Sequence, residues 1–416
     1  MRALLKSKEI SGVDTRIAVT GSKSESNRLL LLKALFSNIT IDNLSNSDDT
    51  VVLKEALEAS SRTVDIHHAG TAMRFLTAYF ASTEGVDLIL SGSQRMHERP
   101  IKILVDALKD LGANIEYIDV DGYPPLRICG AKLKGDYVKM KANVSSQFIS
   151  ALLLIAPSLP KGLTLELEGA ITSRPYINMT LALLNQIDVT TLFEQNTIHI
   201  SPKEVVKNTS FVVESDWSSA SYFYSLIALS NDSKVTLTSY SGESLQGDAA
   251  LCNIYKELGV DTVFNAAERA ITLSKRGGKI SSFLSLDLSN TPDIAQTIAV
   301  TCFGLGIGCK LTGLHTLKIK ETDRLSALKT ELEKLGATIS ITNDSLELEI
   351  NSNAAFSEAN SSVCEIDTYQ DHRMAMAFAP LALKFPLIIN EPMVVTKSFP
   401  SFWEDVERMG IAVDFK

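Results

Sequence analysis

The feature that most constrains the fold of this sequence is a recurring join, at a glycine, between a helical pattern and a strand-like pattern. The glycines of the four clear copies are 77 and 74 residues apart along the second half, and the first gap, of 147 residues, is about twice as long. Glycine commonly closes the C-terminus of a helix. The pattern therefore predicts repeated α/β units of roughly 70 residues. The four copies are 104–112 with 114–117, 251–259 with 261–264, 325–336 with 338–341, and 402–410 with 412–415.

Two weaker copies bring the number of expected units to six. One is 181–187 followed by 189–193, which lacks the glycine, and the other is the shorter 51–57 followed by 63–66. Six units suit two domains of three units each. The alternative is that helix, glycine and strand recur by chance, as they can in any α/β protein. A composition break at 201–216 marks a plausible crossing point between the two halves.

Strand-like segments alternate with helical ones inside these units. Examples are 162–167, 233–238 and 346–350, which carry alternating apolar residues. This alternation sets the fold class as α/β or α+β.

Composition and charge restrict the classes of protein to which this chain can belong. It has 416 residues, 45% of them hydrophobic, which is enough for two or three domain cores. A net charge of −9 argues against a general nucleic-acid or anionic-membrane surface. The five cysteines are scattered without a C-x-x-C pair, so we expect free, buried thiols in a reducing cytoplasm. No segment reads as a signal peptide or a membrane span, which predicts a soluble protein.

The segment 21–28, Gly-Ser-Lys-Ser-Glu-Ser-Asn-Arg, has the composition of an anion-binding site. It places Lys23 and Arg28 among three serines, directly ahead of an apolar helical run. A serine can cap that helix, and the free N–H groups and positive dipole end of the helix favour an anionic ligand. The spacing does not match the nucleotide P-loop. The alternative is an ordinary capped surface helix.

Further polar clusters in the first half resemble this one. In 68–74, His-Ala-Gly-Thr-Ala-Met-Arg, Gly70 allows a ligand to approach the backbone, and 95–99 carries two arginines whose planar forks suit carboxylate or phosphate. Ser145, Ser146 and Gln147 precede another apolar run, where they can serve a ligand or simply cap a helix. The segment 173–176, Ser-Arg-Pro-Tyr, adds a hydroxyl and a phenol, or is a simple turn.

The second half holds the candidates for acid and base chemistry. Asp293 precedes an apolar run, where a carboxylate can cap a helix or act as a general base. The segment 320–324, Lys-Glu-Thr-Asp-Arg, places Lys320 and Arg324 one helical turn apart, which predicts that they share a helix face. The clusters 371–374 and 397–400 complete the set. No Cys or His spacing predicts a metal site, and no G-x-S-x-G segment supports a serine triad.

Ten motifs in this order resemble the 5-enolpyruvylshikimate-3-phosphate synthase family over essentially the whole chain. They are GSKSESNR, HAGTAMR, RMHERP, SSQ, SRPY, SDWSSASYF, TPD, KETDR, DHRMAM and KSFP. The resemblance implies a two-domain inside-out α/β barrel with three units per domain. The domains would be 21–214, and 1–20 with 215–416, with the active site in the cleft between them.

The resemblance also implies the reaction, in which the enolpyruvyl group of phosphoenolpyruvate passes to the 5-hydroxyl of shikimate-3-phosphate and phosphate is released. It implies no metal or organic cofactor, no nucleic-acid or membrane partner, and we expect a cytoplasmic monomer. In this family the herbicide glyphosate competes with phosphoenolpyruvate. Both substrates are multiply anionic, so a preorganised set of cations is needed to bring them together.

Site residues follow from the motifs by resemblance. Asp293 would accept the proton of the attacking hydroxyl, which Lys320 contacts, and Glu321 would deliver a proton to the methylene carbon; Lys23 would touch both substrates. The expected ligands of shikimate-3-phosphate are Lys23, Ser24, Arg28, Ser145, Ser146, Gln147, Ser173, Tyr176, Asp293, Thr316 and Lys320. Those of phosphoenolpyruvate are Lys23, Gly70, Arg99, Gln147, Arg324, Arg373 and Lys397.

Three positions depart from the family pattern, and two other functions stay open. His68, Phe75 and Thr316 stand where the family commonly has Asn, Pro and Asn. The alternatives are an enolpyruvyl transferase acting on UDP-N-acetylglucosamine, which usually has a reactive loop cysteine, and a non-catalytic phosphate-binding protein of the same fold. We also expect the seven site cations to repel one another until anionic substrates bind and the two halves close.

Overall fold

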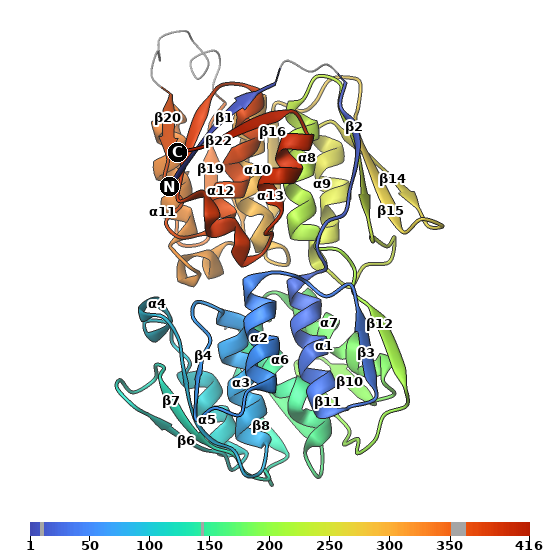
Figure 1. The fold of residues 1–416 in the computed structure, drawn as a ribbon, viewed down its shortest axis with the longest axis vertical. Coiled ribbons are helices and arrows are strands. Elements are labelled where there is room, and N and C mark those ends of the chain that lie inside the picture. Colours follow the sequence, from blue (N-terminus) through green and yellow to red (C-terminus); the bar gives the residue numbers. More distant parts are fainter. Residues whose placement is uncertain (9–11, 143–144, 351–362) are drawn as a thin grey trace. The chain divides into compact units, whose positions relative to one another are not determined.

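The computed structural model describes residues 1–8, 12–142, 145–350 and 363–416. The chain divides into two compact units (Figure 1). Unit 1 combines Met1–Thr20 with Glu214–Lys416, and unit 2 is Gly21–Val213. The chain therefore starts in one unit, builds the whole of the other, and returns.

One sheet topology recurs in five four-stranded sheets of the described chain. In the sheet β4-β5-β7-β6, β4 and β5 are parallel, and β7 pairs antiparallel with both β5 and β6. Helix α3 (Gly70–Ser82) connects the parallel pair, and α5 (Lys102–Asp110) leads to the third strand. A crossover helix between parallel strands is the standard solution to joining their ends. The repeat is thus strand, helix, strand, helix, strand, strand.

Unit 2 contains two of these sheets and a smaller third one. Its strands are β3 (Ile39–Asp42), β4 (Thr63–Asp65), β5 (Asp87–Ser91), β6 (Asn114–Tyr117), β7 (Leu126–Cys129), β8 (Tyr137–Lys141), β9 (Leu163–Glu168), β10 (Thr191–Glu194), β11 (Thr197–Ile200) and β12 (Thr209–Val212). Its helices are α1 (Lys23–Leu35), α2 (Asp48–Glu58), α3, α4 (Gln94–His97), α5, α6 (Ser146–Ile155), the 3-10 turn Ala156–Ser158 and α7 (Arg174–Gln186).

Unit 1 contains the other three four-stranded sheets. Its strands are β1 (Arg2–Ser7), β2 (Asp14–Ile17), β13 (Lys234–Thr238), β14 (Val260–Asn265), β15 (Ala270–Lys275), β16 (Phe283–Asp287), β17 (Gly308–Thr312), β18 (Ile339–Ile341), β19 (Leu346–Leu348), β20 (Cys364–Ile366), β21 (Leu387–Asn390) and β22 (Ile411–Phe415). Its α-helices are α8 (Trp217–Leu229), α9 (Leu251–Glu257), α10 (Ala295–Leu305), α11 (Arg324–Lys334), α12 (His372–Phe378) and α13 (Phe402–Arg408). Its 3-10 helices are Gly247–Ala250, Pro292–Ile294, His315–Ile319, Ala379–Leu383 and Pro392–Lys397.

The chain's first strand completes its last repeat. β1 lies between β21 and β22 and pairs antiparallel with both, so that Leu5 faces Leu387 on one side and Val413 on the other. The sheet order β20-β21-β1-β22 therefore has the same pattern as the others. In this sheet β1, from the opposite end of the sequence, takes the place that β7 has in β4-β5-β7-β6.

The shortest predicted copy has both its helix and its strand, but the two do not belong to the same unit. The helix expected at 51–57 exists as α2, but the following strand, β4, pairs with β5 as the first strand of the next sheet. The sixth sheet contains only the parallel pair of β3 and β12. The other five predicted joins are present, and Gly112, Gly259, Gly336 and Gly410 have the positive φ angles expected of helix C-terminal glycines.

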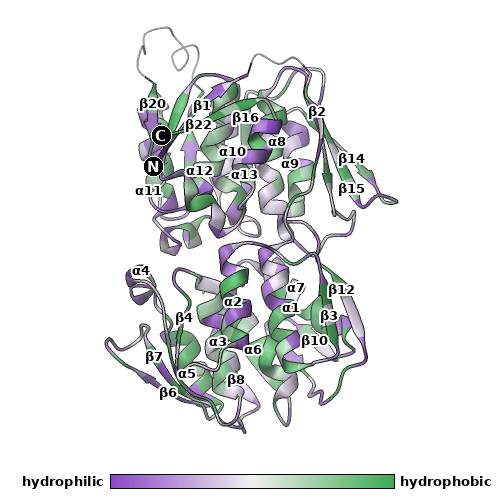
Figure 2. Cartoon of the chain, in the orientation of Figure 1, coloured by the Kyte–Doolittle hydropathy of each residue, from purple (hydrophilic) through white to green (hydrophobic). Residues whose placement is uncertain are grey.

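Three helices at the centre of each unit are buried on nearly every side. In unit 1, every residue of α8 and α12 is buried, as are ten of the eleven residues of α10. Helices of this kind belong inside a core, which here has the sheets around it; Figure 2 shows the hydropathy of each residue. The expected inside-out α/β architecture is confirmed. In unit 2 the corresponding helices are α1, α3 and α6.

Two central helices of unit 1, α8 and α10, run in the same direction. Ser221 Oγ of α8 lies 3.0 Å from Thr297 Oγ1 of α10, and one turn further Thr301 Oγ1 donates to Ser225 Oγ at 2.8 Å. In unit 2, Gln147 at the start of α6 contacts Thr71 at the start of α3. The N-termini of α8 and α10 in unit 1, and those of α3 and α6 in unit 2, are therefore neighbours, so that two positive dipole ends lie close together in each unit.

The cysteines and the lengths of the helices test two further expectations from the sequence. All five cysteines are free, but only Cys302 and Cys309 are buried, while the other three are partly exposed because they lie at strand ends or helix surfaces. Within the described ranges, no helix has the length and apolar character needed to cross a bilayer.

Candidate active site

In unit 1, a carboxylate and several cations meet at the N-terminal end of α10. Asp293 lies in the 3-10 turn Pro292–Ile294 just ahead of this helix. Its Oδ1 accepts a hydrogen bond from Arg324 Nη1 at 3.0 Å and lies 3.6 Å from Lys320 Nζ, and its Oδ2 lies 3.5 Å from Arg373 Nη2. The N-cap position of α10 is taken by Ile294, and Asp293 lies one residue earlier, inside the 3-10 turn. Three nearby cations favour the ionised carboxylate.

The expectation that Lys320 and Arg324 share a helix face is wrong. Helix α11 begins at Arg324, and Asp323 caps it by accepting hydrogen bonds from the backbone N–H groups of Leu325 and Ser326. Lys320 follows the 3-10 helix His315–Ile319, and its backbone is not helical. The Asp323 cap sets the N-terminal end of α11, so the helix does not extend back to Lys320. Both cations still reach the same oxygen of Asp293.

Glu321 is held by two cations. Its Oε1 accepts a hydrogen bond from Lys397 Nζ at 2.7 Å, and its Oε2 accepts one from Arg324 Nη2 at 2.9 Å. Lys397 is 5% exposed, so its charge has little access to water. These charge-assisted bonds favour the ionised form of Glu321.

Asp371 is a member of this cluster to which the sequence assigned no role of its own within the motif 371–374. Its Oδ2 accepts a hydrogen bond from Arg324 Nε at 2.7 Å, and its Oδ1 accepts one from the backbone N–H of Arg373 at 2.8 Å. Asp371 therefore caps α12 and orients Arg324 at the same time. Its place within the Asp-His-Arg-Met motif was the available signal.

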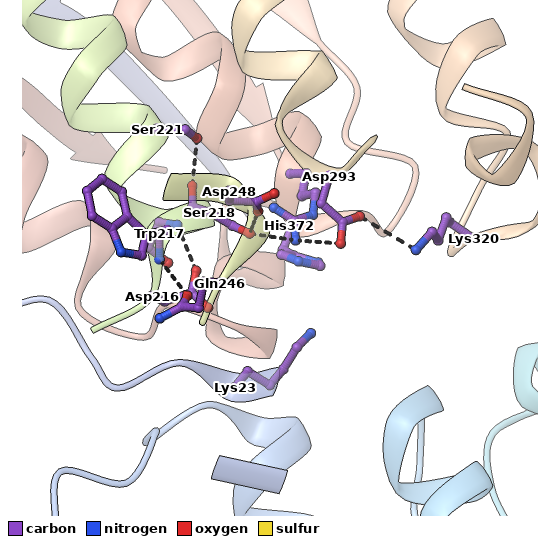
Figure 3. A network of polar contacts seen from close by, with 12 residues as sticks. Lys23, Asp216, Trp217, Ser218, Ser221, Gln246, Asp248, Asp293, Lys320 and His372 are labelled. Carbon is purple, nitrogen blue, oxygen red and sulfur yellow. Dashed lines mark hydrogen bonds and ion pairs between the residues drawn. The ribbon is translucent and has the colours of Figure 1, made fainter. Parts of the chain in front are cut away.

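A second contact chain connects Asp293 with a buried carboxylate on another element. Arg373 Nη2 lies 3.5 Å from Asp293 and donates to Ser218 Oγ at 3.4 Å, and Ser218 Oγ in turn donates to Asp248 Oδ2. Burial, and then the charge of Asp293, raise the pKa of Asp248 to about 7. Figure 3 shows Ser218, Asp248, Asp293 and Lys320 along this network. Nothing in the local sequence around Asp248 predicted its part in it.

The environment also changes the affinity of the cations for protons. Burial lowers the pKa of Lys320, although the charge of Asp293 opposes this effect. Burial alone would lower the pKa of Arg324, but Asp371 and Glu321 outweigh it and the net change is upward. The expected mutual repulsion of the cations is present, since Arg373 acts to lower the pKa of both Lys320 and Arg324, but the carboxylates between them offset much of it within unit 1.

In unit 2, the opening motif forms the start of α1, as expected. Ser22 caps the helix by accepting a hydrogen bond from Glu25 N at 3.4 Å. Lys23, the first helical residue, places its Nζ 3.3 Å from Asp49 Oδ2, at the start of α2. Asp49 is 2% exposed and was not proposed from the sequence, where it is one of two aspartates in a helix's first turn. This ion pair offsets the charge of Lys23.

Arg28 is buried more deeply than a simple ligand-binding arginine. It is 2% exposed, and burial lowers its pKa to about 10. Its guanidinium donates to Thr180 Oγ1, Ser150 Oγ and the carbonyls of Ser24 and Tyr176. Four of its five N–H donors are thus engaged. Phe75, one of the departures from the family pattern, places its ring centroid 5.5 Å from the guanidinium carbon, within cation–π distance.

The starts of α3 and α6 lie against each other in unit 2. Gln147 Nε2 donates to Thr71 Oγ1 at 3.1 Å, and Ser145 caps α6 through Gln147 N. A Cβ atom added to Gly70 would lie 2.4 Å from Arg99 Nη1, so the guanidinium packs directly over this glycine. Gly70 and Arg99, predicted to serve one ligand, are therefore in contact.

The remaining predicted residues lie at element boundaries. Ser173 precedes α7 with a left-handed φ of 53° and makes no side-chain cap, and Tyr176 is in the first turn of the same helix. Ser146 begins α6, and Ser24 lies in the first turn of α1. Thr316 lies in the 3-10 helix His315–Ile319, and its buried Oγ1 has no hydrogen-bond partner among the described residues.

Each unit thus gathers its own share of the predicted residues. In unit 1 these residues form one connected ion-pair network, and Thr316 is the predicted member that makes no contact in it. In unit 2 they form separate small groups at the starts of α1, α3, α6 and α7. Among the residues that the structure describes, no group of three or more His, Cys, Asp or Glu side chains could hold a metal ion. The network members of unit 1 are Asp293, Lys320, Glu321, Arg324, Asp371, Arg373 and Lys397.

Comparison with known proteins identifies clear relatives. The family model described as EPSP synthase (3-phosphoshikimate 1-carboxyvinyltransferase) matches residues 51–406. A 3-phosphoshikimate 1-carboxyvinyltransferase of Bacteroides fragilis is 45% identical, covering 99% of both chains. One of Haemophilus influenzae is 35% identical and covers 96% of this chain and 97% of its own. The solved EPSP synthase of Acinetobacter baumannii has the same fold, with a TM-score of 0.78, 20% identity and complete coverage of both chains.

Proposed function

This chain belongs to the EPSP synthase family, and we propose that it transfers the enolpyruvyl group of phosphoenolpyruvate to the 5-hydroxyl of shikimate-3-phosphate, releasing phosphate. The observation that carries the proposal is the network of unit 1, in which Arg324 contacts both Asp293 and Glu321. One cation thereby connects the proposed base and the proposed acid of an addition–elimination reaction. The relatives do not favour the UDP-sugar alternative, because they are named for the shikimate substrate.

The proposed base is Asp293. Three cations lie within 3.6 Å of its carboxylate oxygens, which supports an ionised group able to accept a proton. Lys320 contacts the same oxygen that would take the proton from the 5-hydroxyl. Its pKa, lowered by burial, makes this lysine a better proton donor than an exposed one. Together they would activate the hydroxyl and accept its proton.

The proposed acid is Glu321, which must carry a proton when the enolpyruvyl double bond is attacked. Its contacts with Lys397 and Arg324 favour the ionised form. A carboxylate or phosphate group of phosphoenolpyruvate would compete for these two cations, because both are established partners of such oxyanions. Withdrawal of the cations raises the proton affinity of Glu321. Substrate binding would therefore create the acid that the reaction requires.

The residues of unit 2 would bind and align the anions. Lys23, with its ion pair to Asp49, would exchange a carboxylate partner for a substrate oxyanion. Gly70 and Arg99 would serve phosphoenolpyruvate, while Gln147, at the start of α6, would touch both substrates. Four of the five Arg28 donors are engaged by other described residues, so the share of Arg28 in shikimate-3-phosphate binding would be small. The serine and tyrosine hydroxyls Ser24, Ser145, Ser146, Ser173 and Tyr176 and the hydroxyl of Thr316 would bind the phosphate and ring of that substrate.

We further propose that both units act as domains contributing to one reaction, and that the enzyme works as a cytoplasmic monomer without a cofactor. The five free cysteines and the net charge of −9 support a reducing compartment and the absence of a nucleic-acid partner. Light scattering of the purified protein should give the mass of one chain, 45.3 kDa. A larger mass at micromolar concentration would show an oligomer.

The decisive experiment is a phosphate-release assay. Purified protein would be incubated with phosphoenolpyruvate and either shikimate-3-phosphate or UDP-N-acetylglucosamine. We expect phosphate release and the enolpyruvyl ether only with shikimate-3-phosphate. Turnover only with the UDP-sugar would establish the other transferase, and binding of shikimate-3-phosphate without any turnover would establish a non-catalytic protein.

A further inference from the structure

The loop ahead of α12 contains two consecutive residues in the left-handed backbone region. Tyr369 has a φ of 53° and Gln370 a φ of 56°. This conformation is unfavourable for residues with a side chain, and it persists only where surrounding contacts impose it. The next residue is Asp371, the partner of Arg324. The strained pair therefore directly precedes the carboxylate that orients a central arginine of the network.

A buried glutamate outside that network holds the loop. Glu331, in α11, is 0% exposed. Its Oε1 accepts a hydrogen bond from Tyr369 Oη at 2.6 Å, and its Oε2 accepts bonds from Lys334 Nζ at 2.8 Å and from Asp367 N at 3.1 Å. Burial and the Glu331 carboxylate raise the pKa of Tyr369 to about 12, so the phenol remains a donor.

Helix α11 contacts this loop at two points. Arg324, its first residue, bonds Asp371 after the strained pair, and Glu331, two turns later, bonds Tyr369 and Asp367 at and before it. Asp371 N also donates to Thr368 O at 2.8 Å, which closes the turn. The left-handed residues are thus held between two attachments to the same helix.

We infer that Glu331 and Tyr369 are positioning residues, which hold the strained turn so that Asp371 meets Arg324 in the geometry needed to bind phosphoenolpyruvate. The inference rests on the proposed function, because it assigns Arg324 to that substrate. Among the hydrogen bonds and ion pairs of the described residues, neither residue is joined to the network except through the loop and the helix. Loss of the Tyr369 hydroxyl should let the turn relax, and Asp371 would then move away from Arg324.

The test is a steady-state kinetic comparison of Tyr369→Phe, Tyr369→Phe combined with Gln370→Gly, and the control Tyr117→Phe. The Tyr117 hydroxyl is buried and has no partner among the described residues, so its removal reports the general effect of losing a phenol oxygen. Glycine adopts the left-handed region without strain. The double variant therefore removes the strain at one of the two left-handed positions and should depend less on the Glu331 contact to keep the turn.

We expect Tyr369→Phe to raise the KM for phosphoenolpyruvate by about fivefold or more, with the KM for shikimate-3-phosphate within about twofold of wild type. The double variant should return the KM for phosphoenolpyruvate to within about twofold of wild type, and Tyr117→Phe should change neither of the two KM values. A merely structural role would lower the melting temperature without a selective change in one KM. An unchanged KM in Tyr369→Phe, or an equal rise in the double variant, would overturn the inference.

Two further outcomes are distinguishable. If Tyr369→Phe does not fold, the double variant carries the test, because glycine at position 370 lowers the strain of its turn. Wild-type KM values in the double variant would support the inference, and a raised KM for phosphoenolpyruvate would overturn it. If the wild-type protein itself shows no turnover with shikimate-3-phosphate, the proposed function fails rather than the positioning role alone.

Discussion

Arg324 Nε lies 2.7 Å from Asp371 Oδ2, and the two side chains are 2% and 0% exposed. Forty-seven positions separate them in the sequence. A buried ion pair of this kind contributes little net stability compared with apolar packing, but removal of one partner leaves the other charge buried without compensation. The pair therefore makes the fold of unit 1 depend on the same arginine that the reaction is proposed to use.

Replacing Asp371 with Asn should lower the free energy of unfolding by about 3 kcal/mol and weaken phosphoenolpyruvate binding. The amide can still cap α12, so the loss reports the missing charge opposite Arg324. Denaturant unfolding and the KM for phosphoenolpyruvate would measure the two effects. The control is Asp323→Asn, another capping aspartate, whose carboxylate accepts bonds from Leu325 and Ser326. That variant should stay within about 1 kcal/mol of wild type, and equal losses in both would contradict the prediction.

Replacing Asp293 with Asn should reduce turnover by about a thousandfold, because the amide cannot accept the proton of the attacking hydroxyl. Binding of shikimate-3-phosphate should stay within about tenfold, since the shape of the site is kept. Phosphate release and calorimetric titration would measure the two quantities. Asp287→Asn, at an exposed carboxylate that accepts a bond from Ser289 N, should leave both unchanged. A fully active Asp293→Asn enzyme would remove the proposed base.

Replacing Gly70 with Ala should raise the KM for phosphoenolpyruvate about tenfold, because the new methyl group would lie 2.4 Å from Arg99 Nη1 and must displace that guanidinium. The change in the KM for shikimate-3-phosphate should be smaller. Gly277→Ala is the matched control, since no heavy atom lies within 4 Å of a Cβ added there. Unchanged kinetics in Gly70→Ala would show that Arg99 does not need its present position.

Replacing Asp248 with Asn should change the pH dependence of stability. The pKa of Asp248 is raised from 3.8 to about 7 in the folded chain. The contribution of this group to the free energy of unfolding is therefore complete at a pH below the unfolded pKa, and it is lost as the pH rises through 7. In wild type this loss amounts to up to about 4 kcal/mol, and the amide lacks it. Denaturant unfolding from pH 4 to 8 should therefore show that the free energy of unfolding of the variant rises relative to that of wild type as the pH increases. A difference that stays constant over this range would contradict the raised pKa.

Much of the local structure could be predicted from neighbouring residues. Helix starts at Ser22, Ser145 and Asp371 follow from capping side chains ahead of apolar runs. The helix, glycine and strand joins follow from periodicity and C-terminal glycine. Lys320 shows the limit of such reasoning, because its four-residue spacing from Arg324 predicted a shared helix face that the cap at Asp323 prevents.

The sequence by itself determined the repeated α/β unit, the family and the motifs rich in cations, because all of these depend on residues close together in the chain. Only the tertiary structure decided which carboxylates meet those cations. Asp371 reaches Arg324, and Asp49 reaches Lys23, through the packing of separate helices. The same packing buries Arg28 against the ring of Phe75 and engages four of its five donors. Ion pairs of this kind depend on the distance between side chains and on their burial, and neither follows from the spacing of residues along the chain.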